Sequence, residues 1–580
     1  MQDAGCKNAR YNCPLAHLQT CKLAHLQTLP GRHPMTTETQ FYRRAEEWLY
    51  RMAERNPVMA THIGIHRYDD RLGDRTLAAL EEEQQEVRAA LAELRAMDLS
   101  DFRTDARIDH ILLTHILESS VRSYEKVQGH RRYPGGYLEE PLGGIFLLIV
   151  RDFAPQPERL RAALGRVRET PRVLREATAN IIPEQVPRVW AEIALEQARQ
   201  APGLFVGLLP AIAADAAPDL QADLAQAGQA AAQAVQEYAS FIENDVLPRA
   251  AGDFAAGRAL FDEMLREEHM VDYDADQLLQ VGWEQFHLTR RQMEEVARQI
   301  DPNRSVQDLL EEAKADHPTA EGLLDAYREA MAAVRQYVID HEIATIPEGE
   351  ILQVVETPPY LRPVIPYAAY MPPGILEERQ EGIFLVTPVD PSAPPEVQEQ
   401  TLRGHSRAKL PVTALHEAYP GHHLQLVWAN RQETIPRRMG TFLATLFIEG
   451  WAFYCEELME QLGYIAEPIQ RLGRLADQLW RAARIIIDVS IHTRGMSVDE
   501  AVDFLVRECQ LEPANALAEV RRYTTSPTQP QSYLMGKLAI LDLVADYRRA
   551  HPEASMRQIH DAILGCGSLP PRLMRQRLLG

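Results

Sequence analysis

Residues 416–423 read His-Glu-Ala-Tyr-Pro-Gly-His-His, and residues 449–452 read Glu-Gly-Trp-Ala. Neutral imidazole and carboxylate groups are the ligands of catalytic zinc sites, which leave one coordination position for water. Zinc lowers the pKa of that water, and a neighbouring glutamate can take its proton as the water attacks a carbonyl carbon. The two segments therefore predict a zinc peptidase in which separate helices meet at the metal.

The spacing of the histidines departs from the common His-Glu-x-x-His pattern, in which the second histidine lies one helical turn after the first. Here that position is Pro420, which cannot coordinate a metal. On a regular helix His423 would lie roughly 10 Å beyond His416, and His422 would point about 120° away from it. Pro420 and Gly421 favour a bulge or kink. We therefore expect a distortion that brings one of these two histidines to the metal, with His422 favoured because it directly follows the irregularity.

Three glutamates accompany the histidines. Glu417, beside His416, is the expected general base. Glu449 stands in a strongly apolar segment, where a buried carboxylate needs a partner such as a metal ion. Glu456 shares a helix face with Glu449, and it either orients a ligand imidazole or is a solvated surface acid. The alternative for the whole segment is an ordinary helix kink with capped or solvated histidines, which the clustering of these residues argues against.

The patterns His-Glu-x-x-Pro-Gly-His-His-x-Gln and Glu-Gly-Trp-Ala-x-Tyr-x-Glu resemble those of the bacterial domain-of-unknown-function family 885. The resemblance extends to residues 57–64, 484–492 and 532–537, and so covers nearly everything after residue 36. That family is grouped with the gluzincin metallopeptidases, which implies a helical zincin-like fold and a reaction class but no substrate. Residues 449–452 are also similar to the Glu-Gly-Phe-Ala that carries the third zinc ligand in the large aminopeptidase family.

Two further groups of residues are candidates for the reaction. Arg484, Asp488 and His492 recur every fourth residue and form a polar stripe on an otherwise apolar helix. His492 either donates to a substrate carbonyl or oxyanion, with Asp488 fixing its tautomer, or belongs to a structural ladder. Related peptidase families place a tyrosine hydroxyl over the metal, and Tyr533 is the matching candidate, with Tyr523 as the alternate.

Composition excludes several classes of partner. The 580 residues carry a net charge of -22, which argues against nucleic acid and against anionic membranes. The apolar run at residues 145–150 is far shorter than the roughly 20 residues that a membrane-spanning helix needs. Beyond residue 34 the sequence holds three scattered cysteines, too few for a disulfide framework, so we expect a cytoplasmic protein.

Hydrophobic periodicity predicts a mainly α protein with a small β-sheet just before the metal helix. The family resemblance implies that this is a large helical zincin-like peptidase fold. Prolines exclude helix from most of 350–395, where short strands are expected at 351–355, 367–371 and 382–387. Paired glycines at 135–136 and 143–144 suggest a loop. We expect an extension at 1–34, an N-terminal helical half at 35–345 and a catalytic half at 346–580. Helices are expected near 37–55, 76–97, 103–126, 157–180, 188–201, 220–247, 275–299, 318–341, 396–408, 437–461, 465–494 and 531–548.

The sequence thus predicts a zinc-dependent enzyme that hydrolyses short peptides, with Zn²⁺ as its cofactor. Two alternatives stay open: a metallohydrolase of a non-peptide amide or ester, and a non-catalytic helical scaffold. Glu417 argues against the scaffold, because a purely structural zinc site has no need of a base. The sequence sets neither the end from which a peptide is cut nor the oligomeric state.

Overall fold

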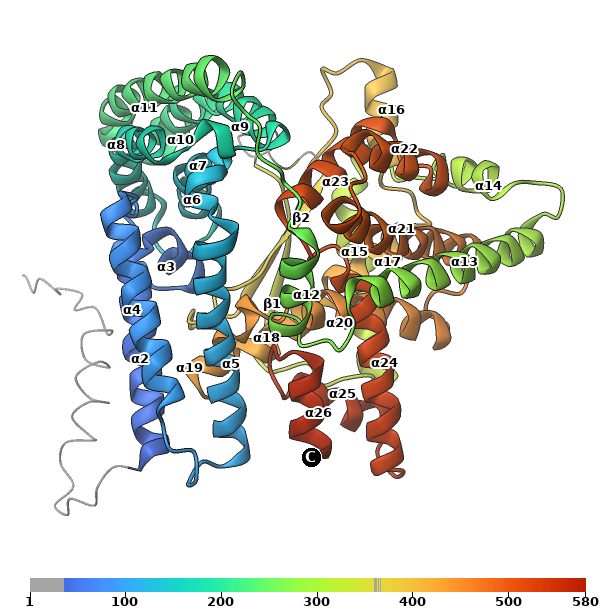
Figure 1. The fold of residues 1–580 in the computed structure, drawn as a ribbon. Helices are drawn as coiled ribbons and strands as arrows, with labels where there is room; N and C mark the ends of the chain where they lie inside the picture. The colour runs from blue at the N-terminus through green and yellow to red at the C-terminus, as the bar shows by residue number, and fades with distance from the viewer. Residues whose placement is uncertain (1–35, 359–361, 363–364, 366) are drawn as a thin grey trace, which may run out of the picture.

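The computed structural model describes residues 36–358, 362, 365 and 367–580, and the extension predicted at 1–34 lies outside them. Helices dominate, and a small three-stranded sheet lies near the middle of the molecule (Figure 1). The mainly α fold with a small sheet is therefore confirmed. Within the described residues, no helix combines the length and the apolarity needed to cross a membrane.

The first part of the chain forms the helical layer at the left of Figure 1, with α8 to α11 at its upper end. Phe41, Ala45 and Leu49 recur every fourth residue along α2 and form its buried face. That face shares a core with Leu94 of α4 and Leu113 of α5, as an amphipathic helix requires. The helices of this part are α2 (Thr37–Arg55), α3 (Pro57–Ile63), α4 (Leu77–Arg95), α5 (Thr104–Arg122), α6 (Gly129–Arg132), α7 (Pro134–Val150), α8 (Gln156–Asn180), α9 (Arg188–Gln200), α10 (Leu209–Ala216) and α11 (Gln221–Phe241).

The remaining helices pack in two larger cores. Phe286 of α13 and Ile485 of α21 share one core, and Val334 of α15 and Leu415 of α17 share the other. Each core contains helices from before and after residue 345. The division into two halves near that residue remains a prediction. These helices are α12 (Gly257–Glu267), α13 (Ala275–Ile300), α14 (Val306–Ala313), α15 (Leu323–Asp340), α16 (Pro395–Arg403), α17 (Leu410–Glu417), α18 (His422–Asn430), α19 (Ile435–Met439), α20 (Thr445–Gln461), α21 (Pro468–Thr493), α22 (Val498–Cys509), α23 (Pro513–Thr525), α24 (Ser532–Ala550), α25 (Met556–Leu564) and α26 (Pro571–Leu579).

The three predicted strands are present as β1 (Ile351–Glu356), β2 (Ala368–Met371) and β3 (Glu381–Val386). Their order is β1-β3-β2, with β1 parallel and β2 antiparallel to the central strand β3. Side chains alternate across the sheet. Phe384 lies in the core that contains Leu415 of α17, whereas Leu385 packs with Ile365 on the other face. The sheet therefore lies directly against the helix that carries His416.

Two predictions of detail were wrong. The paired glycines expected to mark a loop lie inside α7, where Tyr137, Leu138 and Ile145 are buried in a core with α8. Burial of these apolar side chains outweighs the modest helix penalty of glycine. The single helix expected at 437–461 is divided, since α19 ends at Met439 and α20 begins at Thr445.

Helices α20 and α24 cross where neither has room for a side chain. A Cβ on Gly536 would lie 1.9 Å from the carbonyl oxygen of Leu446, and one on Gly450 would lie 2.4 Å from the carbonyl carbon of Gly536. Glu449 directly precedes Gly450, and Tyr533 stands three residues before Gly536. The crossing therefore brings Tyr533 close to Glu449, whose charge, added to the effect of burial, raises the pKa of the tyrosine.

The substitution Gly536→Ala should lower stability by about 1–3 kcal/mol, because the added methyl group can be accommodated only if two helices separate. Gly473→Ala is the matched control, since nothing lies within 4 Å of a Cβ at that position of α21. Alanine there should be neutral or stabilising by roughly 0.5–1 kcal/mol. Thermal unfolding of both variants measures the difference, and equal midpoints would contradict the packing argument.

His66 ties the N-terminal helices to the segment between β2 and β3. Its Nδ1 lies 2.9 Å from Asp69 and its Nε2 lies 3.0 Å from Glu377, and the ring stacks on Phe153 with centroids 3.6 Å apart. Burial alone would lower the pKa of His66, but the two carboxylates raise it to about 9. The protonated imidazole therefore links two parts of the chain that are distant in sequence.

The pKa of His66 in the folded protein, about 9, lies above its value of about 6.5 in the unfolded chain. Protonated His66 therefore stabilises the fold fully below about pH 6.5, and this stabilisation disappears as the pH rises through 9. We expect His66→Gln to lower stability by up to about 3 kcal/mol near pH 6 and by much less near pH 10. Calorimetric melting across this range checks the trend. His341→Gln, at an exposed helix end, should melt like the wild type at each pH, and a pH-independent loss in His66→Gln would contradict the assignment.

Candidate metal centre

The interruption predicted at Pro420 and Gly421 is present between two short helices. Helix α17 ends at Glu417 and α18 begins at His422, and the chain between them leaves helical geometry at Ala418, where φ is -109° and ψ is -87°. A Cβ on residue 421 would lie 1.9 Å from the carbonyl oxygen of His416. Only glycine permits so close an approach, and it allows α18 to begin beside the end of α17.

His416, His422 and Glu449 converge, each offering one ligand atom, with all three atoms within 4.8 Å of one another. The two imidazole rings are nearly perpendicular, with centroids 4.8 Å apart. His422 Nε2 lies 3.4 Å from a carboxylate oxygen of Glu449. Two ligands of a tetrahedral zinc ion with bonds of about 2.0–2.1 Å are about 3.3 Å apart. The donor types and their separation therefore fit zinc.

Glu456 lies behind the first histidine. Its Oε1 is 2.8 Å from His416 Nδ1, and its side chain is almost fully buried. Of the two roles that the sequence left open, contact with an imidazole is the one observed. A carboxylate on one ring nitrogen fixes the tautomer and turns the other nitrogen toward the ligand cluster. His422 has no such support, since its buried Nδ1 lacks a hydrogen-bond partner among the described residues.

The electrostatics of Glu449 and His422 reflect their proximity. Burial raises the pKa of Glu449, but the adjacent His422, with the charges of His416 and Arg484, lowers it to about 2. Burial lowers the pKa of His422, and the Glu449 carboxylate raises it above its usual value. Glu449 is therefore held as a carboxylate, the form that binds a metal.

Glu417 has a half-buried carboxylate that makes no hydrogen bond or ion pair within the described part of the chain. Its charge, after the larger effect of burial, raises the pKa values of Tyr327 and Tyr370, so both phenols are nearby. Each phenol is engaged elsewhere, Tyr327 with His405 at 2.9 Å and Tyr370 with His423 at 3.0 Å. Glu417 is thus an acceptor without a donor.

His423 does not join the cluster. Its Nε2 lies 2.8 Å from a carboxylate oxygen of Glu350, and its Nδ1 is hydrogen-bonded to the Tyr370 hydroxyl at 3.0 Å. Burial raises the pKa of Glu350, but His423 and Tyr419 lower it to about 2. A Cβ on Gly382 of β3 would lie 2.5 Å from His423 Nδ1, so the sheet packs directly against this ring. Sequence reasoning missed Glu350 and Tyr370, which only the strand prediction could have placed near the site.

His492 lies apart from the cluster, with both ring nitrogens bonded to main-chain groups. Its Nε2 donates to the carbonyl oxygen of Tyr523 at 3.0 Å, and its Nδ1 accepts from the amide of Ala256 at 3.3 Å. Asp488 accepts from the amide of Thr528. The role of His492 in binding an oxyanion is therefore not supported, because neither nitrogen is free to face a substrate.

The two candidate tyrosines differ in position. Tyr533 is half-buried near Glu449, and the Arg484 guanidinium lies over its ring, 4.5 Å from the centroid. Tyr523 is fully buried, and its hydroxyl accepts a hydrogen bond from Arg484 Nε at 3.0 Å. The hydroxyl of Tyr523 is therefore engaged by Arg484, whereas Tyr533 is the candidate whose pKa the charge of Glu449 affects.

A second group, His115, Glu118 and Glu267, also meets the distance condition for a metal. Each member already has a partner. Arg95 lies 2.7 Å from Glu118, and Arg266 lies 2.8 Å from Glu267. His115 Nδ1 donates to the carbonyl oxygen of Glu267 at 2.8 Å. These contacts satisfy the charges, so the group is better explained as surface ion pairs.

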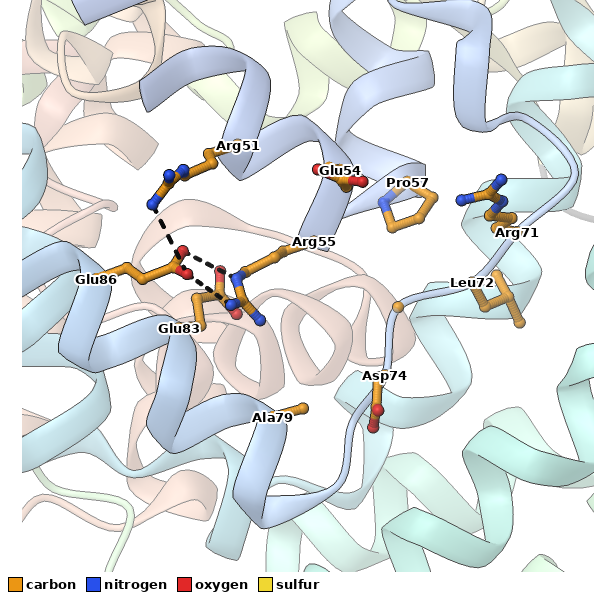
Figure 2. Close-up of a pocket in the computed structure, with 11 residues that line it drawn as sticks. Arg51, Glu54, Arg55, Pro57, Arg71, Leu72, Asp74, Ala79, Glu83 and Glu86 are labelled. Atoms are coloured by element: carbon orange, nitrogen blue, oxygen red, sulfur yellow. Dashed lines mark hydrogen bonds and ion pairs between the residues drawn. The ribbon is translucent and has the colours of Figure 1, made fainter. Parts of the chain in front are cut away.

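A cavity of about 470 Å³ lies between α2, α4 and the loop that follows Tyr68. Figure 2 shows residues that line it. Arg55 spans it to contact Glu86 at 2.7 Å, and Arg51 reaches the same carboxylate at 4.0 Å. Its lining contains none of the clustered ligands. The cavity is a surface groove closed by ion pairs rather than a reaction site.

A larger cavity, about 560 Å³, follows α17 and α21. Its lining includes Val412, one turn before His416 on α17, together with Asp477 and Trp480 of α21 and Glu519 of α23. Since Val412 precedes His416 by a single turn, this cavity lies beside the end of α17 that carries His416.

Comparisons with known proteins agree with the fold. Two solved structures are similar: "a putative lipoprotein of unknown function from Shewanella oneidensis", 24% identical with a TM-score of 0.77, and "the putative lipoprotein from Colwellia psychrerythraea", 16% identical with a TM-score of 0.80. The first alignment covers 94% of this chain and 100% of the other, and the second covers 93% and 98%. At these identities the likeness shows the fold alone.

A search of curated proteins found no match. A family model described as "Bacterial protein of unknown function (DUF885)" matches residues 57–578, a range that contains α3 to α25, the sheet and every residue of the candidate metal centre. The family predicted from the histidine and glutamate motifs is thereby confirmed. The protein belongs to the bacterial family of unknown function DUF885.

Proposed function

We propose that this protein is a zinc-dependent peptidase acting on short peptides. The convergence of His416, His422 and Glu449 within 4.8 Å carries the proposal. Glu456 supports it by orienting His416, and Glu417 supports it as a carboxylate without a partner in the described chain. A structural metal site would have no use for such a carboxylate, whereas hydrolysis requires one.

A bound zinc ion would supply Lewis acidity at the open coordination position. Glu417 accepts the proton of the attacking water and returns it to the leaving amine. Tyr533, whose pKa is raised by burial and by the charge of Glu449, donates a hydrogen bond to the oxygen that becomes negative in the transition state. Glu456 keeps His416 in the tautomer that directs Nε2 to the metal. Glu350 holds His423 against the sheet, which keeps that imidazole out of the ligand set.

We also propose a cell-envelope location in place of the cytoplasmic one predicted from cysteine content. Both similar structures are described as lipoproteins, and that description is the support for the change. Fractionation of cells that express the protein distinguishes the two locations.

The wild-type protein should bind about one zinc ion per chain, and His422→Ala should lose it, because that imidazole is a ligand. His423→Ala should retain it, since its ring faces Glu350 instead. Glu456→Gln should weaken binding roughly 10- to 100-fold through the loss of ligand orientation. Elemental analysis after chelation and reconstitution measures the zinc content, and circular dichroism confirms folding. Equal zinc content in the two histidine variants would contradict the ligand assignment.

Glu417→Gln should retain zinc and lose about 10²- to 10⁴-fold in turnover, because the amide cannot accept the proton. Hydrolysis of a library of di- to decapeptides, scored by mass spectrometry, measures the loss, with amide and ester panels run in parallel. Glu433→Gln, at the surface turn after α18, is a matched control and should keep full activity. Near-normal turnover in Glu417→Gln would refute the mechanism, and cleavage of esters alone would refute the substrate class.

A further inference from the structure

One turn of α21 presents three buried hydrogen-bond donors without partners in the described chain. They are Trp480 Nε1, Arg481 Nε and Arg484 Nη1. The large majority of buried side-chain polar atoms in folded proteins have a hydrogen-bond partner, so three unpartnered ones in a single turn require an explanation. All three are donors, which points to a ligand that accepts hydrogen bonds.

Arg484 is held rigidly in this turn. Its guanidinium lies between two aromatic rings, 4.3 Å from the centroid of Trp480 and 4.5 Å from that of Tyr533. Its Nε donates to the Tyr523 hydroxyl at 3.0 Å and its Nη2 donates to Glu519 at 3.1 Å. The side chain is about 95% buried, with a relative exposure of 5%. Two of its three nitrogens are therefore fixed, and Nη1 alone is left for another molecule.

This turn lies between the candidate metal centre and the larger cavity. Trp480 and Glu519, which contact Arg484, both line that cavity. On the other side, the Arg484 guanidinium lies over the ring of Tyr533. Tyr533 stands three residues before Gly536, which packs against the turn of α20 that carries Glu449. No ion pair joins Arg484 to Glu449 within the described residues, so Arg484 Nη1 is not bonded to this candidate metal ligand.

Resting on the proposed peptidase function, we propose that Arg484, with Trp480 and Arg481, binds a carboxylate group of the substrate peptide. A planar guanidinium matches the geometry of a carboxylate better than an ammonium group does. Asp477 pairs with Arg481, and Glu519 pairs with Arg484. These ion pairs balance the charges of the two arginines, so a ligand would be recognised by the remaining hydrogen-bond donors. A peptide whose C-terminal carboxylate binds there would have a peptide bond near its C-terminus at the metal. The enzyme would therefore trim peptides from the C-terminus.

Binding to the inactive Glu417→Gln protein tests this without turnover. Calorimetry compares N-acetyl-tetra-alanine, its C-terminal amide, and that amide with aspartate replacing the last alanine. The free acid should bind at least roughly tenfold more tightly than the plain amide, which corresponds to one charged hydrogen bond. Added in the same background, Arg484→Lys should remove most of this preference, because lysine lacks the planar fork. Trp480→Phe, which removes only the indole N–H, should reduce it less.

Arg474→Lys in the same background is the matched control, since Arg474 is a buried arginine of the same helix that pairs with Glu460 and Gln478. It should keep the preference for the acid, and circular dichroism checks that each variant folds. Tight binding of the aspartate peptide alone would assign the site to an acidic side chain rather than the terminus. Equal binding of all three peptides, or an equal loss in both arginine variants, would overturn the proposal. Acid preference without hydrolysis of any peptide by the wild type would refute the peptidase function and leave the carboxylate site standing.

Discussion

The candidate metal centre depends on one close backbone contact, between Gly421 and the carbonyl oxygen of His416. A side chain at residue 421 would lie 1.9 Å from that oxygen. Because the chain can turn this tightly, α18 begins with His422 facing His416, and the two rings stand 4.8 Å apart. A continuous helix would have carried His422 about 120° away. The insertion that distinguishes this motif from the common one is thus absorbed entirely between α17 and α18.

Around this turn each histidine has its own glutamate. His416 contacts Glu456 at 2.8 Å and His423 contacts Glu350 at 2.8 Å, while His422 lies 3.4 Å from Glu449. Burying a charged or polar group without a partner is costly, so these pairs decide which way each ring faces. Glu417 is the exception, with no partner in the described chain. The same pairing that orders the histidines leaves the Glu417 carboxylate without a partner among the described residues.

Helix α21 divides its polar stripe between two tasks. At its C-terminal end Asp488 and His492 bind main-chain groups of residues 523–528 and so anchor the loop that leads to α24. One turn earlier, Arg484 is fixed by Tyr523 and Glu519, and its Nη1 has no hydrogen-bond partner among the described residues. The anchored loop positions Tyr533 at the start of α24, where the glycine crossing with α20 brings it near Glu449.

Local sequence determined the mainly helical class, the three strands, the interruption at Pro420 and the residue types of the candidate metal centre, because periodicity, proline and donor type act over a few residues. Only the tertiary structure shows that His422 lies with His416 and Glu449 while His423 faces Glu350, since this depends on a residue more than 70 positions earlier and on the backbone of β3. The same holds for His492, whose nitrogens are taken by the distant residues Ala256 and Tyr523. It holds also for α7, whose glycines remain helical because tertiary burial outweighs local propensity.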